Sequence, residues 1–280
     1  MLKANQESEN ALLDAVLAST RYRDLCPDLV RFIGRQELHK RRNLKEAIKA
    51  TKNKLHQVGG MYFDTLPDTQ AWLNEVQQIL SAQDTCAEES AALHAACRRM
   101  MQCHISTRER LPILDQFYAT IFAQLGPIHS ILDLACGLNP LSLPWMLAAN
   151  AQRPLTYYAC DIYQSLATLH ENWFRLLDIQ GHAATCNILQ QAPLSSVDVA
   201  LLLKTIPCLE QIDKAATHAL LQTIPARYLV ISFPIHSVGG RNKGMLSYYE
   251  QHFHALPGLN DSKTQRFEFA TELVFVVKHS

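Results

Sequence analysis

The second half of the chain alternates short apolar runs with helix-length segments, and this alternation limits the fold more than any other feature. The runs cover residues 130–134, 156–160, 197–203 and 227–233. Strands separated by helices predict a doubly wound α/β domain with a mainly parallel sheet. Two last runs, 267–269 and 273–277, lie too close together for a crossover connection, so they must pair antiparallel.

This order of elements is typical of class I S-adenosylmethionine-dependent methyltransferases, whose Rossmann-like sheet ends in an antiparallel hairpin. The first 105 residues show no alternating strand pattern and are predicted to be helical. Asn43 with Glu46, and Asp68 alone, are suited to cap two of these helices. We therefore expect an all-helical N-terminal domain over residues 1–105 and an α/β catalytic domain over residues 106–280.

Positive charge is concentrated in the N-terminal part, although the chain as a whole is balanced. Lys and Arg together number 26, as do Asp and Glu. Between Ser19 and His56, however, there are eleven Lys/Arg and only four Asp/Glu. A helical face of this kind is either simply solvated or binds nucleic acid, and charge alone does not decide between the two.

Eight cysteines are present, but their spacing does not fit a zinc site. A chain of 280 residues does not need disulfides for stability, so we expect reduced thiols, as in a cytoplasmic protein. The first ten residues are polar, and no run approaches the ~20 apolar residues of a membrane span. The sequence therefore predicts no metal and no membrane association.

The first predicted strand leads into Asp133-Leu134-Ala135-Cys136-Gly137, where open α/β sheets bind ligands. Gly137 lets the backbone approach a ligand, but neither the dinucleotide motif G-x-G-x-x-G nor a phosphate loop is present. Both motifs bind phosphates, which S-adenosylmethionine lacks. Asp161 follows the second strand and suits ribose hydroxyls or a helix cap, and Asn187-Ile188 suit an adenine ring.

Two further positions are candidates for the same cleft. Lys204 follows the apolar run 197–203, and its side chain either contacts substrate or extends to solvent. Arg110 suits a bidentate contact with the methionine carboxylate of the cofactor. Ser106 with Glu109 fits a capping box, while Pro112 is too deep in the following pattern for a regular helix start.

The segment after the predicted strand 227–233 is rich in glycine and cationic. It contains His236, Arg241 and Lys243. Such a segment is either an exposed surface loop or a contact to a phosphate backbone, which positions a nucleic acid without reading its sequence.

Several stretches together resemble the aminoglycoside-resistance 16S rRNA methyltransferases, which methylate N7 of guanine 1405. The stretches are RYRDLCPDLVRF, HISTRERL, ILDLACGLNPLSL, LLLKTIPCLE, SFPIHSVGGRNKGM and ATEL, with residues 59–63 in addition. The pair GLNP and GGRNKGM is specific, and the similarity covers nearly the whole chain. Two positions depart from the family pattern: Asn187 stands where an aspartate is expected, and His236 where an arginine is more usual.

The resemblance implies a set of site residues. Those expected at the S-adenosylmethionine pocket are Tyr62, His104, Ile105, Ser106, Arg110, Ala135, Gly137, Asp161, Asn187, Ile188 and Leu203. Those expected to face rRNA are Arg21, Arg23, Lys40, Arg41, Arg42, Lys45, Lys49, Lys52, His236, Arg241 and Lys243. Lys204 is expected to position the nucleotide.

The expected function is methylation of 16S rRNA within the 30S subunit by a monomeric, cytoplasmic enzyme that does not act on DNA. Guanine N7 has a lone pair and no proton, so no general base is needed, and close alignment of the reactants is the main task. A guanine buried in a helix must first be flipped out. Two alternatives remain at this point: a methyltransferase for small molecules or another RNA, and a non-catalytic RNA-binding protein.

Overall fold

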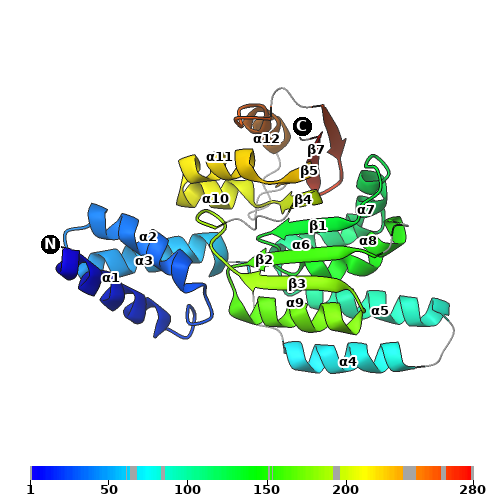
Figure 1. Cartoon of the computed structure of the whole chain (residues 1–280), viewed down its shortest axis with the longest axis horizontal. Coiled ribbons are helices and arrows are strands. Elements are labelled where there is room, and N and C mark those ends of the chain that lie inside the picture. Colours follow the sequence, from blue (N-terminus) through cyan, green and yellow to red (C-terminus); the bar gives the residue numbers. More distant parts are fainter. Residues whose placement is uncertain are drawn as a thin grey trace.

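A seven-stranded sheet of order β3-β2-β1-β4-β5-β7-β6 forms the centre of the computed structural model (Figure 1). The structure describes residues 2–60, 62–63, 68–82, 86–150, 152, 154–191, 196–235, 244–259 and 263–278. The strands are β1 (Ser130–Leu134), β2 (Thr156–Asp161), β3 (Gln180–Thr185), β4 (Val197–Leu203), β5 (Ala226–Pro234), β6 (Thr264–Glu268) and β7 (Glu272–Lys278).

The first five strands are parallel and the last two are antiparallel to their neighbours, as the sequence predicts. Chain order reverses between β1 and β4, so the topological switch point lies between these two central strands. The central strands are buried on both faces, which explains why they read as continuous apolar runs rather than alternating ones.

Helices cover both faces of this sheet. The α/β part contains α6 (Ile105–Arg110), α7 (Leu114–Phe122), α8 (Leu143–Ala149), α9 (Gln164–Leu176), α10 (Ile206–Ile212), α11 (Lys214–Thr223) and α12 (Met245–His254). Apolar side chains of α7, α8 and α9 share one hydrophobic core with one sheet face, and those of α10, α11 and α12 share a second core with the other face.

The N-terminal helices divide into two groups (Figure 1). The helices are α1 (Leu2–Leu17), α2 (Pro27–Lys40), α3 (Leu44–Leu55), α4 (Thr69–Ser81) and α5 (Cys86–Met101). The first three pack together at one end of the molecule, whereas α4 and α5 lie under the sheet beside α9, where Trp72 and Trp173 have ring centroids 5.2 Å apart. The domain boundary at residue 105 stays a prediction, but α4 and α5 share a core with the sheet.

Local chemistry explains several helix ends. Asn43 caps α3 by accepting a hydrogen bond from Glu46 N at 2.9 Å, and Asp68 caps α4 by accepting one from Ala71 N at 3.0 Å. The predicted Ser106–Glu109 capping box is wrong: α6 begins at Ile105, and no side chain caps it. The irregularity expected at Pro112 is confirmed, since a 3-10 turn over Leu111–Ile113 separates α6 from α7.

A π-helical turn over His56–Gly60 extends α3 toward the sheet. Such turns are rare and are frequent at functional sites. Gly59 sits where a Cβ would lie 2.8 Å from the side chain of Ile162, so this turn packs directly on the end of β2. Within the described parts of the chain, no helix has the length and apolarity needed to span a membrane.

Candidate functional site

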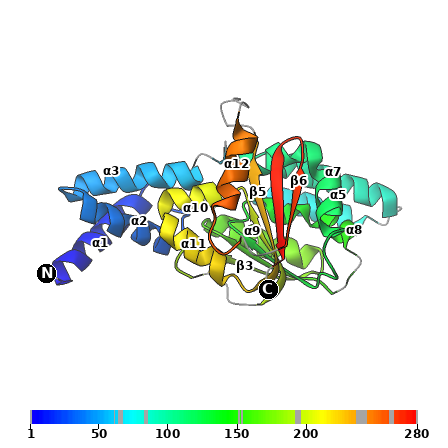
Figure 2. The same cartoon turned by 90° about the horizontal axis from the view of Figure 1, so that it is seen from above.

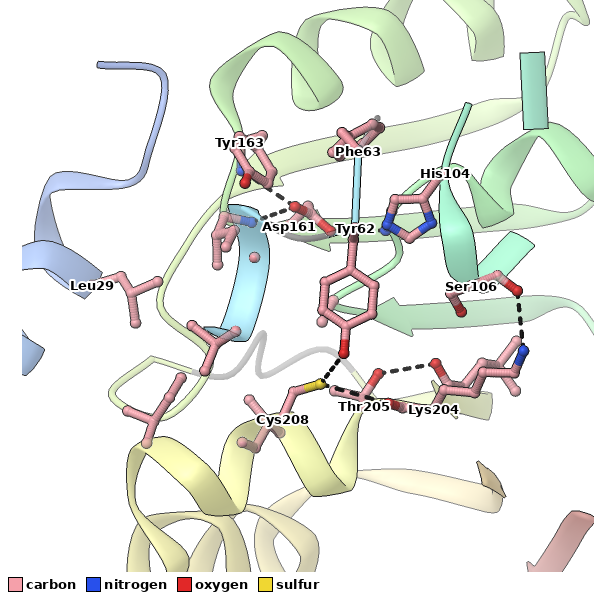
Figure 3. A pocket seen from close by; sticks show the side chains of 18 residues that line it. Leu29, Tyr62, Phe63, His104, Ser106, Asp161, Tyr163, Lys204, Thr205 and Cys208 are labelled. Atoms are coloured by element: carbon pink, nitrogen blue, oxygen red, sulfur yellow. Dashed lines mark hydrogen bonds between the residues drawn. The ribbon is translucent and has the colours of Figure 1, made fainter. Parts of the chain in front are cut away.

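A pocket that is partly open to solvent lies at the carboxyl ends of β1, β2 and β4 (Figure 3). This is the place beside the switch point where doubly wound sheets bind their ligands. It is lined by Leu29, Val58, Gly59, Tyr62, Phe63, His104, Ser106, Ala135, Gly137, Asp161, Ile162, Tyr163, Leu203, Lys204, Thr205, Cys208, Leu209 and Ile212.

The backbone is strained where the strands end in this pocket. Ala135 has φ +53°, Gly137 has φ +52° and Lys204 has φ +60°. Non-glycine residues rarely adopt this left-handed region, and such strain is concentrated at functional sites. At Gly137 a Cβ would lie 2.7 Å from His104 Cε1, so glycine is also required for close packing.

Asp161 ties the ends of β1 and β2 together. One carboxylate oxygen accepts a hydrogen bond from Gly137 N at 2.7 Å, and the other accepts from Ile162 N at 2.7 Å and Tyr163 N at 3.3 Å. Burial raises the pKa of Asp161, and these backbone donors oppose that shift. The carboxylate is therefore held rigidly on the pocket wall, in the place predicted for a ribose contact.

His104 is almost fully buried between the rings of Tyr62 and Phe63, with ring centroids 5.8 Å and 4.7 Å away. Burial, with the nearby charge of Lys204 and Arg110, lowers the pKa of His104 to about 3, so the imidazole is neutral. Its Nδ1 atom is buried and has no hydrogen-bond partner within the described part of the chain. A buried polar atom without a partner at a pocket wall is available to a bound ligand.

A second buried histidine forms a hydrogen bond with the loop that follows β1. His170 on α9 is fully buried, and its Nε2 lies 2.7 Å from the carbonyl oxygen of Gly137. Because a carbonyl only accepts hydrogen bonds, Nε2 carries the proton and donates it. Burial lowers the pKa of His170 to about 4, which keeps this ring neutral too.

Lys204 lines the pocket, but its ammonium group is held by the protein. Nζ donates to the carbonyl of Ser106 at 3.2 Å (Figure 3). It also donates to Glu109 Oε2 at 2.8 Å. It also lies 3.3 Å from Glu272 Oε1. The side chain is 5% exposed and joins β4 to α6, so the alternative that it extends to solvent is wrong, while its contact with substrate stays a prediction.

Arg110 does not line the pocket. Its Nε and Nη2 pair with the two carboxylate oxygens of Glu272 at 2.8 Å and 3.0 Å, and its Nη1 donates to Asn139 Oδ1 at 2.8 Å. The guanidinium predicted to meet the methionine carboxylate of the cofactor therefore already has carboxylate and amide partners inside the protein. Its proximity to the cofactor stays a prediction.

The buried hydrogen bonds of Asn139 give the GLNP motif a structural role. Its amide nitrogen donates to Asp133 Oδ2 at 2.8 Å, and its oxygen accepts from Arg110 and from Tyr118 Oη at 2.6 Å. Tyr157 Oη also donates to Asp133 at 2.7 Å. Burial raises the pKa of Asp133 to about 6, although both hydrogen bonds oppose the shift. Asn139 thus links β1 to α6 within the core and does not face the cleft.

Three other expected cofactor residues lie apart from the pocket lining. Ile105 begins α6, and Ile188 packs in the second hydrophobic core. Asn187 is buried and lines a separate cavity with Asp28, Gln190 and Gln191. Its amide nitrogen donates to Gln190 Oε1 at 3.0 Å, and its oxygen accepts from Leu189 N at 3.2 Å. Their contacts with the cofactor stay predictions.

Sequence reasoning missed the contribution of the N-terminal helices and of α10. Leu29 and Val58 come from the N-terminal part, and Cys208 comes from α10, where its sulfur lies 2.7 Å from Tyr62 Oη. Tyr163 lies just beyond the end of β2 and forms an isolated antiparallel bridge with Leu25. Helical periodicity marks such residues as core, and only tertiary packing reveals that they border a cavity.

The expectation of reduced thiols is wrong for one pair. Cys160 and Cys186 form a disulfide that joins the ends of the neighbouring strands β2 and β3. The parallel register brings these strand ends together, a proximity that linear spacing does not show. Cys26, Cys97, Cys103, Cys136 and Cys208 are free.

Most cations predicted to face rRNA are exposed on the N-terminal helices and the turns that connect them. They are Arg21, Arg23, Lys40, Arg41, Arg42, Lys45 and Lys49, with Lys52 half-buried. Arg41 is paired with Glu37 at 2.9 Å, so its charge is partly neutralised. The other residues predicted to meet rRNA, His236, Arg241 and Lys243, lie outside the described residues.

Comparison with known proteins connects this geometry to a family. The model of the family described as ribosomal RNA methyltransferase (FmrO) matches residues 18–276. A 16S rRNA (guanine(1405)-N(7))-methyltransferase from Micromonospora echinospora is 35% identical, with 94% of each chain covered. One from Serratia marcescens is 34% identical, covering 96% of this chain and 98% of the relative.

Solved structures agree with the sequence comparison. The crystal structure of 16S rRNA methyltransferase RmtF with S-adenosyl-L-homocysteine has a TM-score of 0.80 and 32% identity, with 98% and 99% of the two chains covered. The 16S rRNA methylase RmtB has a TM-score of 0.74 and 29% identity, with 97% and 98% covered. The predicted class I fold is confirmed, and the chain belongs to the ribosomal RNA methyltransferase (FmrO) family.

Proposed function

We propose that this protein transfers a methyl group from S-adenosylmethionine to N7 of guanine 1405 of 16S rRNA in the 30S subunit, and so confers resistance to aminoglycosides. The observation that carries this proposal is the pocket at the switch point, whose wall combines strand ends with residues of the N-terminal helices. Relatives that match nearly the whole chain are named for this reaction. The exposed cations of α2 and α3 favour an RNA substrate over a small molecule.

The residues of the pocket fit S-adenosylmethionine. Gly137 lets the β1 loop pack closely on His104, where a Cβ would clash with the ring, and Asp161 presents a fixed carboxylate suited to ribose hydroxyls. The unpartnered Nδ1 of His104 is available to a polar group, and Tyr62, Phe63 and Tyr163 offer aromatic surface. No site for a phosphate chain is needed, in agreement with the single glycine of the β1 loop.

S-adenosylmethionine, when bound, supplies an electrophilic methyl group. Because guanine N7 carries no proton, the chain has only to bind, orient and exclude water. His104 suits this task as a neutral ring that resists protonation. Lys204 positions the substrate indirectly, because its ammonium group holds α6 against β4 through Ser106 and Glu109.

The proposed contacts with rRNA are made by cations of the N-terminal part of the chain. Arg21 and Arg23, together with the cations between residues 40 and 52, bind phosphates and set the orientation of the enzyme on the 30S subunit. One chain provides a complete pocket wall, which supports a monomeric enzyme, and an rRNA substrate supports a cytoplasmic location.

One experiment tests the function directly. The protein is expressed in a susceptible bacterium, tolerance to kanamycin and gentamicin is measured, and N7-methylguanine is mapped on 16S rRNA. We expect tolerance together with modification at guanine 1405. The Asp161→Ala variant should abolish both, while Glu268→Ala, on the exposed edge strand β6, should keep both. A folded wild-type protein that neither modifies this guanine nor raises tolerance contradicts the proposal.

A further inference from the structure

Tyr248 on α12 is an exposed aromatic residue that contacts two neighbouring rings. Its side chain is 59% exposed, and no other large hydrophobic side chain is exposed among the residues that the structure describes. The ring stacks on the imidazole of His252, with centroids 6.1 Å apart and planes 9° apart. It also meets Tyr249 edge to face at 5.1 Å. The phenol ring thus has two aromatic neighbours and is still mostly exposed.

Two routes of side-chain contacts connect Tyr248 to the elements that line the pocket. His252 Nε2 lies 2.9 Å from Glu210 Oε2, and the other oxygen of Glu210 lies 3.1 Å from His218 Nε2. Glu210 belongs to α10, the helix whose residues Cys208, Leu209 and Ile212 line the pocket. Figure 2 shows α12 beside this helix.

The second route runs through Tyr249. Its ring stacks on the buried Phe233 of β5, with centroids 5.0 Å apart and planes 20° apart. Burial raises the pKa of Tyr249, with Tyr248 and Cys208 contributing further, so its phenol lies within electrostatic range of the pocket residue Cys208. Tyr248 is therefore an exposed aromatic ring at the α12 side of the pocket, and it contacts the rings of Tyr249 and His252.

An isolated, rigid, exposed ring suits a nucleobase better than a protein partner. Protein interfaces bury a contiguous patch of many side chains, and no such apolar patch surrounds Tyr248 in the described part of the chain. A nucleobase needs only one aromatic face, and stacking of this kind tolerates any base. The ring is ordered in advance by His252, so binding costs little side-chain freedom.

We infer that Tyr248 stacks on an rRNA base next to the target guanine and so positions the substrate at the pocket. The inference rests on the proposed function and adds a contact outside the cofactor site and outside the cationic N-terminal surface. It requires the aromatic ring of Tyr248 and not its hydroxyl.

Binding of purified 30S subunits and single-turnover methylation test the inference. Tyr248→Ala should weaken 30S affinity and lower kcat/KM about five- to hundredfold, the range that base stacking provides. Tyr248→Phe and Tyr248→Trp should stay within about twofold of wild type, because both keep a stacking face. Affinity for S-adenosylmethionine and the unfolding temperature should not change in any of the three variants.

His182→Ala is a matched control. The exposed His182 ring also stacks on a tyrosine, Tyr158, at 5.6 Å, but it lies on the β3 edge, at the opposite end of the sheet from β5 and β7. This variant should behave as wild type. If Tyr248→Ala equals wild type, or if its cofactor affinity falls in parallel, the inference is wrong. If the wild-type protein fails to methylate 30S subunits, the proposed function is wrong instead.

Crosslinking identifies the partner. With p-azidophenylalanine at position 248, irradiation of the 30S complex should attach the protein to 16S rRNA. A crosslink to a ribosomal protein alone overturns the inference in favour of a protein contact.

Discussion

Arg110 and Glu272 form a buried ion pair, with Nε and Oε1 2.8 Å apart and both side chains at most 1% exposed. Glu272 also accepts a hydrogen bond from Ser232 Oγ at 2.8 Å and lies 3.3 Å from Lys204 Nζ. Burial alone would raise the pKa of Glu272, but the two cations outweigh it and the pKa is lowered. One carboxylate at the start of β7 therefore fixes α6 and the end of β4 around the pocket.

Replacing this carboxylate should unfold the protein more easily. In Glu272→Gln the shape is kept, but Arg110 and Lys204 no longer share a counter-charge in a buried place. Removing one partner of such a pair costs about 3–5 kcal/mol of the free energy of unfolding. Denaturant titration should show this decrease, and it should show less than about 0.5 kcal/mol for Glu268→Gln, whose partner Arg266 is on the surface. Equal losses of unfolding free energy in the two variants would mean that Glu272 does not hold α6 and the end of β4 in place.

His170 should make the protein sensitive to acid. Its folded-state pKa of about 4 lies below the ordinary 6.5, so the unfolded chain takes up the proton first. The contribution of the neutral ring to the free energy of unfolding is full above pH 6.5 and is lost as the pH falls toward 4. By pH 5 the loss is about 2 kcal/mol. His170→Gln, which keeps a side-chain donor for the Gly137 carbonyl, should show a shallower decline of unfolding free energy between pH 7 and 5. A parallel decline in both proteins would exclude His170 as the cause.

Much of the fold could be predicted because burial on both faces leaves an unmistakable sequence pattern. β1 and β4 lie within the predicted runs, and the hairpin of β6 and β7 follows from the short connection between two apolar segments. Helix caps such as Asn43 could be predicted as well, since the interaction partners are three residues apart.

The features that could not be predicted share a physical cause, which is pairing between residues far apart in the chain. The contact of Arg110 with the cofactor stays a prediction, but the sequence does not show its ion pair with Glu272, 162 residues away. Asn139 follows a strand and a glycine as a turn residue does, yet Asp133 and the side chains of α6 and α7 surround it. The Cys160–Cys186 bond depends on strand register in the same way.

The arginines before α2 should bind rRNA without supporting the cofactor site. In Arg21→Glu/Arg23→Glu, removal of two exposed positive charges should weaken 30S binding. The slope of log K against log salt should fall by about one for each phosphate that is no longer neutralised. S-adenosylmethionine affinity, measured by calorimetry, should stay as in wild type. Arg175→Glu, an exposed site on α9, should affect neither measurement. A decrease of both affinities in the double variant would contradict the assignment of an RNA surface.

The disulfide should be detectable and should stabilise the pocket edge. Cys160 and Cys186 precede Asp161 and Asn187, and the bond closes a loop with a sequence separation of 26 residues. Closing a loop of this size contributes about 3 kcal/mol, so Cys160→Ser/Cys186→Ser should lower the unfolding free energy by that much under non-reducing conditions. Mass spectrometry after alkylation should find two more modified cysteines with reductant than without. The free Cys103→Ser variant should leave both results unchanged.

Gly137 should be the residue of the cofactor site that tolerates substitution least. An alanine would have to adopt φ +52°, which costs about 1–2 kcal/mol, and its Cβ would meet the buried His104 ring at 2.7 Å. We expect Gly137→Ala to weaken S-adenosylmethionine binding at least about tenfold and to lower the unfolding free energy. Gly126→Ala is the matched control, since its Cβ would find only Arg227 at 3.9 Å. Should Gly137→Ala bind the cofactor like wild type, the β1 loop does not approach the ligand through its backbone, and the pocket wall formed by His104 and Asp161 would have to bind it alone.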